Sequence, residues 1–154
     1  MAKKPFIVIF HFVLFLLAII TSILALTDHR KYELTIQFLG KPDAVFDYLM
    51  DSVLLAISIL LVYGYIKAKK WAFKMTFCYY ILYFIGLFIG LYLLITRYEE
   101  FIKFATMIRY GKEREMPFTF KTSILLAMLS ITIKFVFAYF ALRYLKRNKN
   151  YFKN

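Results

Sequence analysis

Four long apolar stretches constrain this chain more than any other feature of its sequence. A helix that crosses a bilayer needs about 20 mostly apolar residues, because the hydrocarbon core is about 30 Å thick and a helix rises about 1.5 Å per residue. The stretches cover residues 6–26, 48–66, 75–95 and 122–142. With 62% hydrophobic residues, the chain lies well above the roughly 45–50% of soluble domains. We therefore expect an all-α, polytopic membrane protein, a four-transmembrane-helix bundle in which residues 1–154 form a single integral membrane domain.

The lysine and arginine residues predict which way this bundle faces. If both termini are cytoplasmic, the inner side carries eleven cations and no carboxylate, whereas the outer side carries nine cations and all nine acids. The inner cations are also denser along the chain, in agreement with the positive-inside rule. We expect a multi-pass protein of the cell membrane with both termini in the cytoplasm. Its basic residues should contact the lipid bilayer and not nucleic acid, because no soluble domain remains to present a basic face.

The segments between and after the apolar stretches carry patterns of their own. In residues 31–38 an apolar side chain stands at every second position, which predicts a short strand or an extended segment on the membrane surface. In the second outer loop, 97–121, apolar residues recur at helical spacing from Tyr98 to Ile108. This spacing predicts a short interfacial helix that ends at Gly111. We expect the basic tail, residues 146–153, to lie on the membrane as a topology anchor, although it could also bind an acidic partner.

Three aspartates are predicted to share one face of a helix. Asp43, Asp47 and Asp51 are spaced by four residues, and Pro42 is well placed as the first residue of that helix. Carboxylates arranged in this way can form an entrance that collects cations. Alternatively, they only complement the dipole at the N-terminus of the helix.

Small and polar residues predict which face of each helix packs against its neighbours. Helices in lipid associate through close backbone approach and through hydrogen bonds between side chains. Gly86 and Gly90 form a GxxxG pair, and the last stretch carries a continuous stripe of small residues around Lys134. The residues that we predict to pack helices together are Gly86, Gly90, Ala127 and Ala138.

Lys134 is the charge predicted to lie deepest in the membrane, about 14 Å from Arg143 by helical rise. An isolated ammonium at this depth costs at least about 2.5–3.5 kcal/mol, so it requires a partner. Asp51 is the carboxylate nearest in depth, and tyrosine or serine hydroxyls are the other candidates. The candidate intramembrane polar site consists of Lys134, Tyr83, Tyr79, His11, Asp51 and Ser130. Two interpretations stay open: a pathway for a solute, or a hydrogen-bonding group that fixes helix register, including register across a subunit boundary.

The sequence contains no motif for an enzyme reaction. It has no HExxH, GxSxG or Walker motif, a single cysteine, and two histidines predicted on opposite sides of the membrane. We therefore expect no enzyme, cofactor or metal site. The leading hypothesis is a non-catalytic accessory or scaffold component that associates with its own copies or with other membrane subunits. The alternatives are an oligomeric channel or carrier for a proton, anion or small polar solute that uses Lys134, and a membrane lipid-modifying enzyme at the outer rim.

Overall fold

Helices account for almost all of the chain in the computed structural model, which describes residues 5–112 and 119–152. The helices are α1 (Phe6–Thr27), α2 (His29–Phe38), α3 (Lys41–Ile66), α4 (Lys70–Thr96), α5 (Tyr98–Tyr110), α6 (Phe120–Arg147) and the short 3-10 helix η1 (Lys149–Tyr151). Of these, α1, α3, α4 and α6 are long and apolar enough to cross a membrane. Each of the four contains one of the predicted apolar stretches, so the expectation of an all-α fold with four such helices is confirmed.

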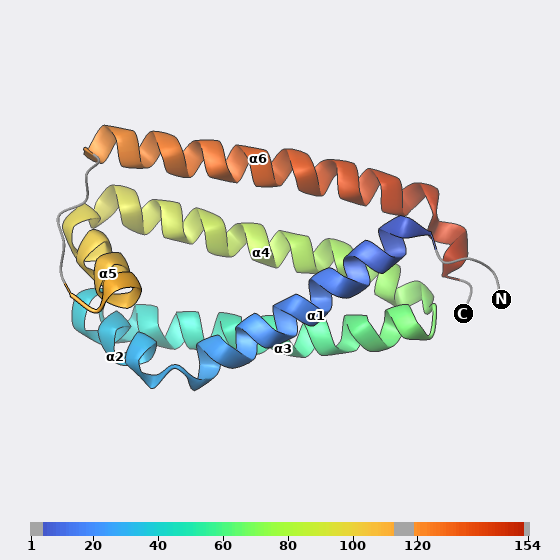
Figure 1. Ribbon diagram of the computed structural model, residues 1–154, viewed down its shortest axis with the longest axis horizontal. Coiled ribbons are helices and arrows are strands. Elements are labelled where there is room, and N and C mark those ends of the chain that lie inside the picture. The colour runs from blue at the N-terminus through green and yellow to red at the C-terminus, as the bar shows by residue number, and fades with distance from the viewer. Residues whose placement is uncertain (1–4, 113–118, 153–154) are drawn as a thin grey trace.

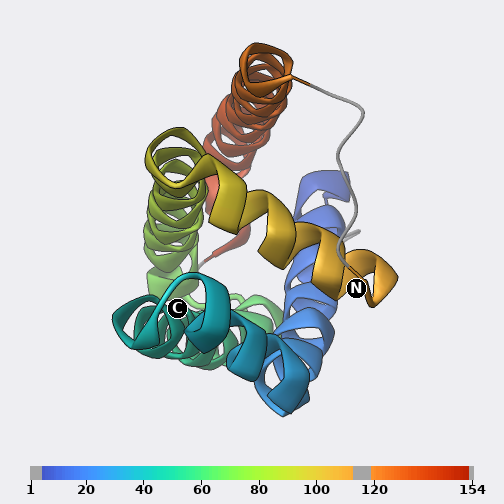
Figure 2. The same cartoon turned by 90° about the vertical axis from the view of Figure 1, so that its left-hand side faces the viewer.

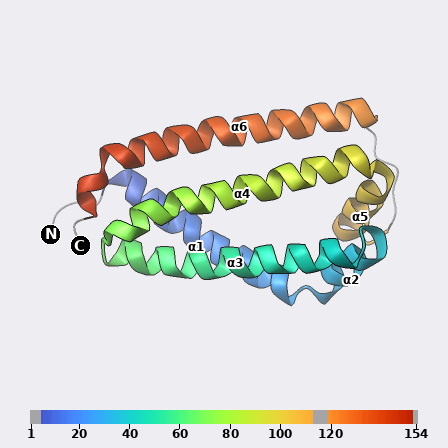
Figure 3. The ribbon, with the colours of Figure 1, turned by 180° about the vertical axis from the view of Figure 1, so that it is seen from behind.

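The four long helices lie lengthwise beside one another, and the two shorter helices lie across one end (Figure 1). We call this end the α2/α5 end, and the opposite end, where α1 begins and α6 ends, the termini end. α1 crosses α3 at a slant and comes close to α6 only near the termini end (Figure 3). Viewed from the α2/α5 end, α6 stands apart from α1 and α3 (Figure 2). α1 and α6 therefore approach each other at the termini end and lie apart at the α2/α5 end (Figure 2, Figure 3).

The best-buried side chains gather in the half of the bundle near the termini end. Phe15 of α1 is fully buried, and its ring centroid lies 5.4 Å from that of Tyr65 and 5.1 Å from that of Tyr79. Gly64 lets α3 and α4 approach here, because a Cβ at this position would lie 2.5 Å from the Ala72 Cβ. All four long helices thus contribute to one core, and its buried aromatic rings come from α1, α3, α4 and the segment after α6.

The strand predicted for residues 31–38 is wrong, because His29–Phe38 forms helix α2. At its first turn, the Asp28 carboxylate accepts a hydrogen bond from the backbone N–H of Lys31 at 3.1 Å. At its last turn, the Arg97 guanidinium donates hydrogen bonds to the carbonyls of Phe38 and Leu39. Backbone N–H and carbonyl groups that have no partner within the helix are thus hydrogen-bonded at both of its ends. The alternation of apolar residues in the sequence does not reveal these contacts.

The helix predicted in the second outer loop is present as α5. It ends where expected, at Gly111, whose φ of 72° is a left-handed conformation that favours glycine. Two arginines connect this end of the molecule: Arg30 donates to the Met107 carbonyl at 3.3 Å, and Arg97 contacts the Asp43 carboxylate at 3.1 Å. The α2/α5 end is therefore held together by polar contacts and not by a large apolar core.

Candidate functional site

Lys134 lies midway along α6 in a groove of about 320 Å³ between α1, α4 and α6. The other residues that line this groove are Leu14, Tyr79, Tyr80, Tyr83, Ile133, Phe137 and Ala138. The Lys134 side chain is exposed and makes no hydrogen bond or ion pair within residues 5–112 and 119–152. A single ammonium therefore stands without a counter-charge in a groove of mostly apolar and aromatic side chains.

The structure brings three of the six predicted polar residues to this groove, and a fourth, His11, lies next to it. Tyr79 and Tyr83 line it together with Lys134, and Tyr80, which the sequence analysis missed, lines it as well. His11 lies behind Tyr80, with its Nε2 atom 3.4 Å from the Tyr80 hydroxyl. The His11 Nδ1–H donates to the Ile7 carbonyl at 2.8 Å. In the neutral ring Nε2 is then an acceptor, so the Tyr80 hydroxyl is the donor.

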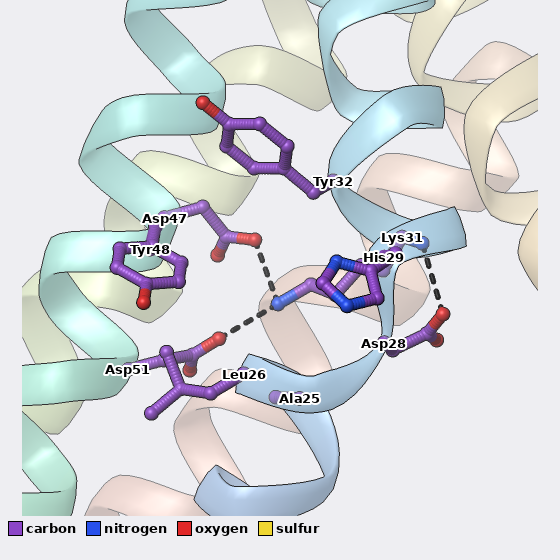
Figure 4. A pocket seen from close by; sticks show the side chains of 9 residues that line it. All are labelled: Ala25, Leu26, Asp28, His29, Lys31, Tyr32, Asp47, Tyr48 and Asp51. Carbon is purple, nitrogen blue, oxygen red and sulfur yellow. Dashed lines mark hydrogen bonds and ion pairs between the residues drawn. The ribbon is translucent and has the colours of Figure 1, made fainter.

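Asp51, one of the candidate partners of Lys134, makes its ion pair elsewhere in the part of the chain that the structure describes. Asp51 accepts a hydrogen bond from Lys31 Nζ at 2.9 Å, and Asp47 contacts the same nitrogen at 2.7 Å (Figure 4). These residues line a separate cavity of about 310 Å³ at the α2/α5 end, together with His29. Burial acts to lower the pKa of Lys31, but the hydrogen bonds and charges of both carboxylates outweigh it, and the pKa is raised.

The three-aspartate face predicted for the start of α3 is present, but every carboxylate on it already has a cation from this chain. Asp43 contacts Arg97, while Asp47 and Asp51 share Lys31. Spacing of four residues could indicate that the carboxylates face one way. It could not indicate which cations the distant helices α2 and α4 would bring to them.

The predicted packing residues differ in what they contact. Ala138 is buried in the groove wall and Ala127 is partly buried. A Cβ added at Gly86 or Gly90 would meet no atom within 4 Å, so the GxxxG pair makes no close helix contact inside one chain. Because these glycines follow Tyr83 by three and seven residues, they continue the tyrosine face of α4 toward the α2/α5 end. Ser130 is exposed, one turn of α6 before Lys134.

A buried hydrogen-bond relay joins α3 to α4 and was not predicted. The Thr76 hydroxyl donates to the Ala72 carbonyl at 2.8 Å and accepts from the Tyr65 hydroxyl at 3.0 Å. The Tyr65 carbonyl in turn accepts from the Tyr151 hydroxyl at 3.1 Å. The available signal was weak: Thr76 and Tyr80 are two polar residues that lie one turn apart on α4.

The groove combines one ammonium with three tyrosine side chains. No group of histidine, cysteine or acidic side chains that could hold a metal ion occurs among the described residues. An ammonium surrounded by tyrosine hydroxyls can bind a carboxylate or another anion. Comparisons with protein families, with curated proteins and with solved structures find no match to this chain. The function must therefore be argued from the groove and its surroundings, because architecture alone does not specify one.

Proposed function

We propose that this protein is a non-catalytic subunit of a membrane assembly, and that its groove receives a membrane helix of another protein that carries a carboxylate. The observation that carries the proposal is the unpartnered Lys134 in the groove. In the proposed arrangement the helices α1, α3, α4 and α6 cross the cell membrane, and both termini face the cytoplasm. The even number of long apolar helices and the shared end of α1 and α6 support this topology.

A lysine midway along a spanning helix needs a counter-charge more than a lysine on a soluble protein does. Hydrocarbon offers the ammonium neither water nor ions, and the cost of leaving it alone is at least about 2.5–3.5 kcal/mol. Snorkelling relieves this cost near the ends of a helix, but Lys134 lies 13 residues before the last residue of α6. The groove side of the lysine is also open, so a partner can reach it.

The sequence indicates that the counter-charge comes from a different protein. α1, α4 and α6 contain no acidic residue, and the acids of α3 all lie in its first half, at the α2/α5 end. A second copy of this chain therefore has no carboxylate at the depth of Lys134. A partner helix with an acidic residue near its centre would supply one.

The open glycines of α4 support the same arrangement. Glycines four residues apart let two helix backbones come close together, and such pairs are common where membrane helices meet. Gly86 and Gly90 are not used in this way within one chain. Phe84 of α4 and Phe135 of α6 lie side by side, with ring centroids 5.4 Å apart. This contact places the glycine face of α4 near the level of Lys134, so an incoming helix on that face would have its middle close to the lysine.

The proposal can be tested with a defined probe helix. A leucine-rich transmembrane peptide with one central Glu, and the same peptide with Gln, are reconstituted with the fluorescently labelled protein in vesicles, and energy transfer reports their association. We expect the Glu peptide to bind about five- to thirtyfold more tightly, from the roughly 1–2 kcal/mol measured for polar contacts between membrane helices. Lys134→Met should abolish this preference, and the matched control Lys121→Met, in the first turn of α6, should retain it. Equal binding of both peptides to the natural chain would refute the proposal.

A carrier for a proton, anion or small polar solute is the second candidate, and the row of polar groups at the groove favours it. Lys134 shares the groove with Tyr80, which is hydrogen-bonded to His11 on the far side. Flux of protons or chloride into vesicles that contain the protein would support this function. Flux that is present in the natural chain and absent in a folded Lys134→Met variant would favour the carrier over the assembly subunit.

A further inference from the structure

The termini end of the bundle carries two adjacent grooves with basic walls. One, of about 690 Å³, is lined by Lys70, Phe73, Lys74, Lys149, Asn150 and Phe152. The other, of about 710 Å³, lies between α4 and α6 and is lined by cations and aromatic rings, namely Arg143, Lys146, Arg147, Lys149, Phe77 and Tyr139. Lys149 lines both grooves, so the two basic grooves meet at this side chain.

The position of Lys149 is fixed by the end of the chain. After α6 the backbone turns back as η1 (Figure 1), and the Phe152 ring is buried against Tyr65 and Phe73 at centroid distances of 5.1 and 6.0 Å. The Tyr151 hydroxyl donates to the Tyr65 carbonyl. The tail is thus part of the folded bundle through Phe152. The basic grooves are built by the fold and are not formed by a loose tail.

Within residues 5–112 and 119–152, no side-chain carboxylate forms an ion pair with these cations. All nine acids of the sequence occur at or before Asp51 or between Glu99 and Glu115, and none belongs to the segments that meet at this end. The first turn of α4, which carries Lys70, has no acidic residue, and its N-cap Lys69 makes no side-chain hydrogen bond to it. The partial positive charge of that helix end therefore adds to the charge of the lysines.

We infer that these two grooves bind one anionic phospholipid whose headgroup carries two phosphate groups, of the cardiolipin type. Each groove receives one phosphate, and Lys149 contacts both. The rings of Phe77 and Tyr139 face the acyl chains, because they line the same groove on the side of the spanning segments. The inference rests on the part of the proposed function that places the four long helices in a membrane, but it does not depend on a partner at Lys134.

The sole tryptophan of the chain reports on this site. Trp71 lies next to Lys70 at the start of α4 and is 38% exposed. The full-length protein is reconstituted in phosphatidylcholine vesicles with small amounts of brominated cardiolipin, brominated phosphatidylglycerol or brominated phosphatidylcholine, and quenching of Trp71 fluorescence gives the enrichment of each lipid beside the protein. We expect cardiolipin to be enriched at least about fivefold over phosphatidylglycerol, the effect of one further cation contact.

Two double variants distinguish lipid binding in the grooves from general attraction of anionic lipids to the basic end of the protein. Lys146→Gln with Lys149→Gln removes two groove cations and should weaken cardiolipin enrichment about 25-fold, at about fivefold per cation. Lys67→Gln with Lys69→Gln removes two cations that line neither groove and should change it less than about twofold. Equal losses in both variants, or equal quenching by cardiolipin and phosphatidylglycerol, would overturn the inference.

The same experiment distinguishes failure of the lipid-site inference from failure of the proposed function. If no brominated lipid quenches Trp71, the chain is not embedded in the bilayer and both proposals fail. If brominated phosphatidylcholine quenches but cardiolipin shows no preference, only the lipid site is refuted. Lys134→Met should leave cardiolipin enrichment unchanged. If free pyrophosphate, added to the vesicles at the concentration of the lipid, displaced brominated cardiolipin fully, the site would be one for soluble phosphates and the inference would be refuted.

Discussion

The substitution Gly64→Ala tests how closely α3 and α4 approach at their turn. The new Cβ would lie 2.5 Å from the Ala72 Cβ and 2.8 Å from a ring carbon of Trp71. Carbon atoms in contact prefer about 3.5–4.0 Å, so the two helices would have to separate by about 1 Å. Ala72 is fully buried and its Cβ is attached directly to the backbone, so it cannot turn away. Overpacking of this kind costs about 1–3 kcal/mol, and we expect the upper part of that range.

Gly86→Ala is the matched control, because its Cβ would meet no atom within 4 Å. Both substitutions replace a glycine in a helix by alanine and share the gain of up to about 1 kcal/mol in helix propensity. The difference between the two variants therefore measures the steric cost alone. Unfolding by sodium dodecyl sulfate in mixed micelles, followed by far-ultraviolet circular dichroism, gives both free energies without relying on Trp71. If Gly64→Ala unfolds at the same denaturant fraction as Gly86→Ala, the close approach of α3 and α4 is refuted.

Two further predictions concern the ends of the bundle. The Lys31→Met variant should lose about 1–2 kcal/mol of unfolding free energy at neutral pH, because Asp47 and Asp51 lose their shared cation. The raised pKa of Lys31 means that the contribution of its charge is fully present below 10.5 and disappears as the pH rises above that value, so the unfolding curves of the two proteins should converge in alkali. Phe152→Ala should release the tail and speed tryptic cleavage after residue 149 by about tenfold or more. Tyr151→Phe, which removes one hydrogen bond, should change that rate only a few-fold, and equal rates in both variants would contradict the buried position of Phe152.

The long helices could be predicted from the sequence because each depends on a local property, a run of apolar side chains. α2 could not, since its alternating residues fit a strand as well as a helix, and the contact that caps its end comes from Arg97, 58 residues after Leu39. The local signal for α2 was its N-cap. Asp28 lies three residues before Lys31, and its carboxylate accepts a hydrogen bond from the backbone N–H of that residue.

The candidate site was predictable in its composition but not in its partners. Depth along the helices grouped Lys134 with Tyr79 and Tyr83, and these three residues line one groove. It could not show that α1 and α6 diverge (Figure 2), or that Lys134 makes no ion pair with the described residues. Depth along the helices suggested Asp51, yet Lys31 reaches that carboxylate from a helix that the sequence analysis did not predict.

The uneven burial of α6 also affects which partner helices the proposed groove site would distinguish. The buried residues of α6, namely Ala138, Ala141 and Leu145, all lie in its second half. Only 11% of its most apolar segment is buried, against 28% for α1. The first half of α6 therefore presents most of its apolar side chains to its surroundings, while its second half holds the helix in the core. If the groove receives a partner helix as proposed, apolar contacts with the first half of α6 would be alike for many helices, so a charge opposite Lys134 would be what distinguishes them.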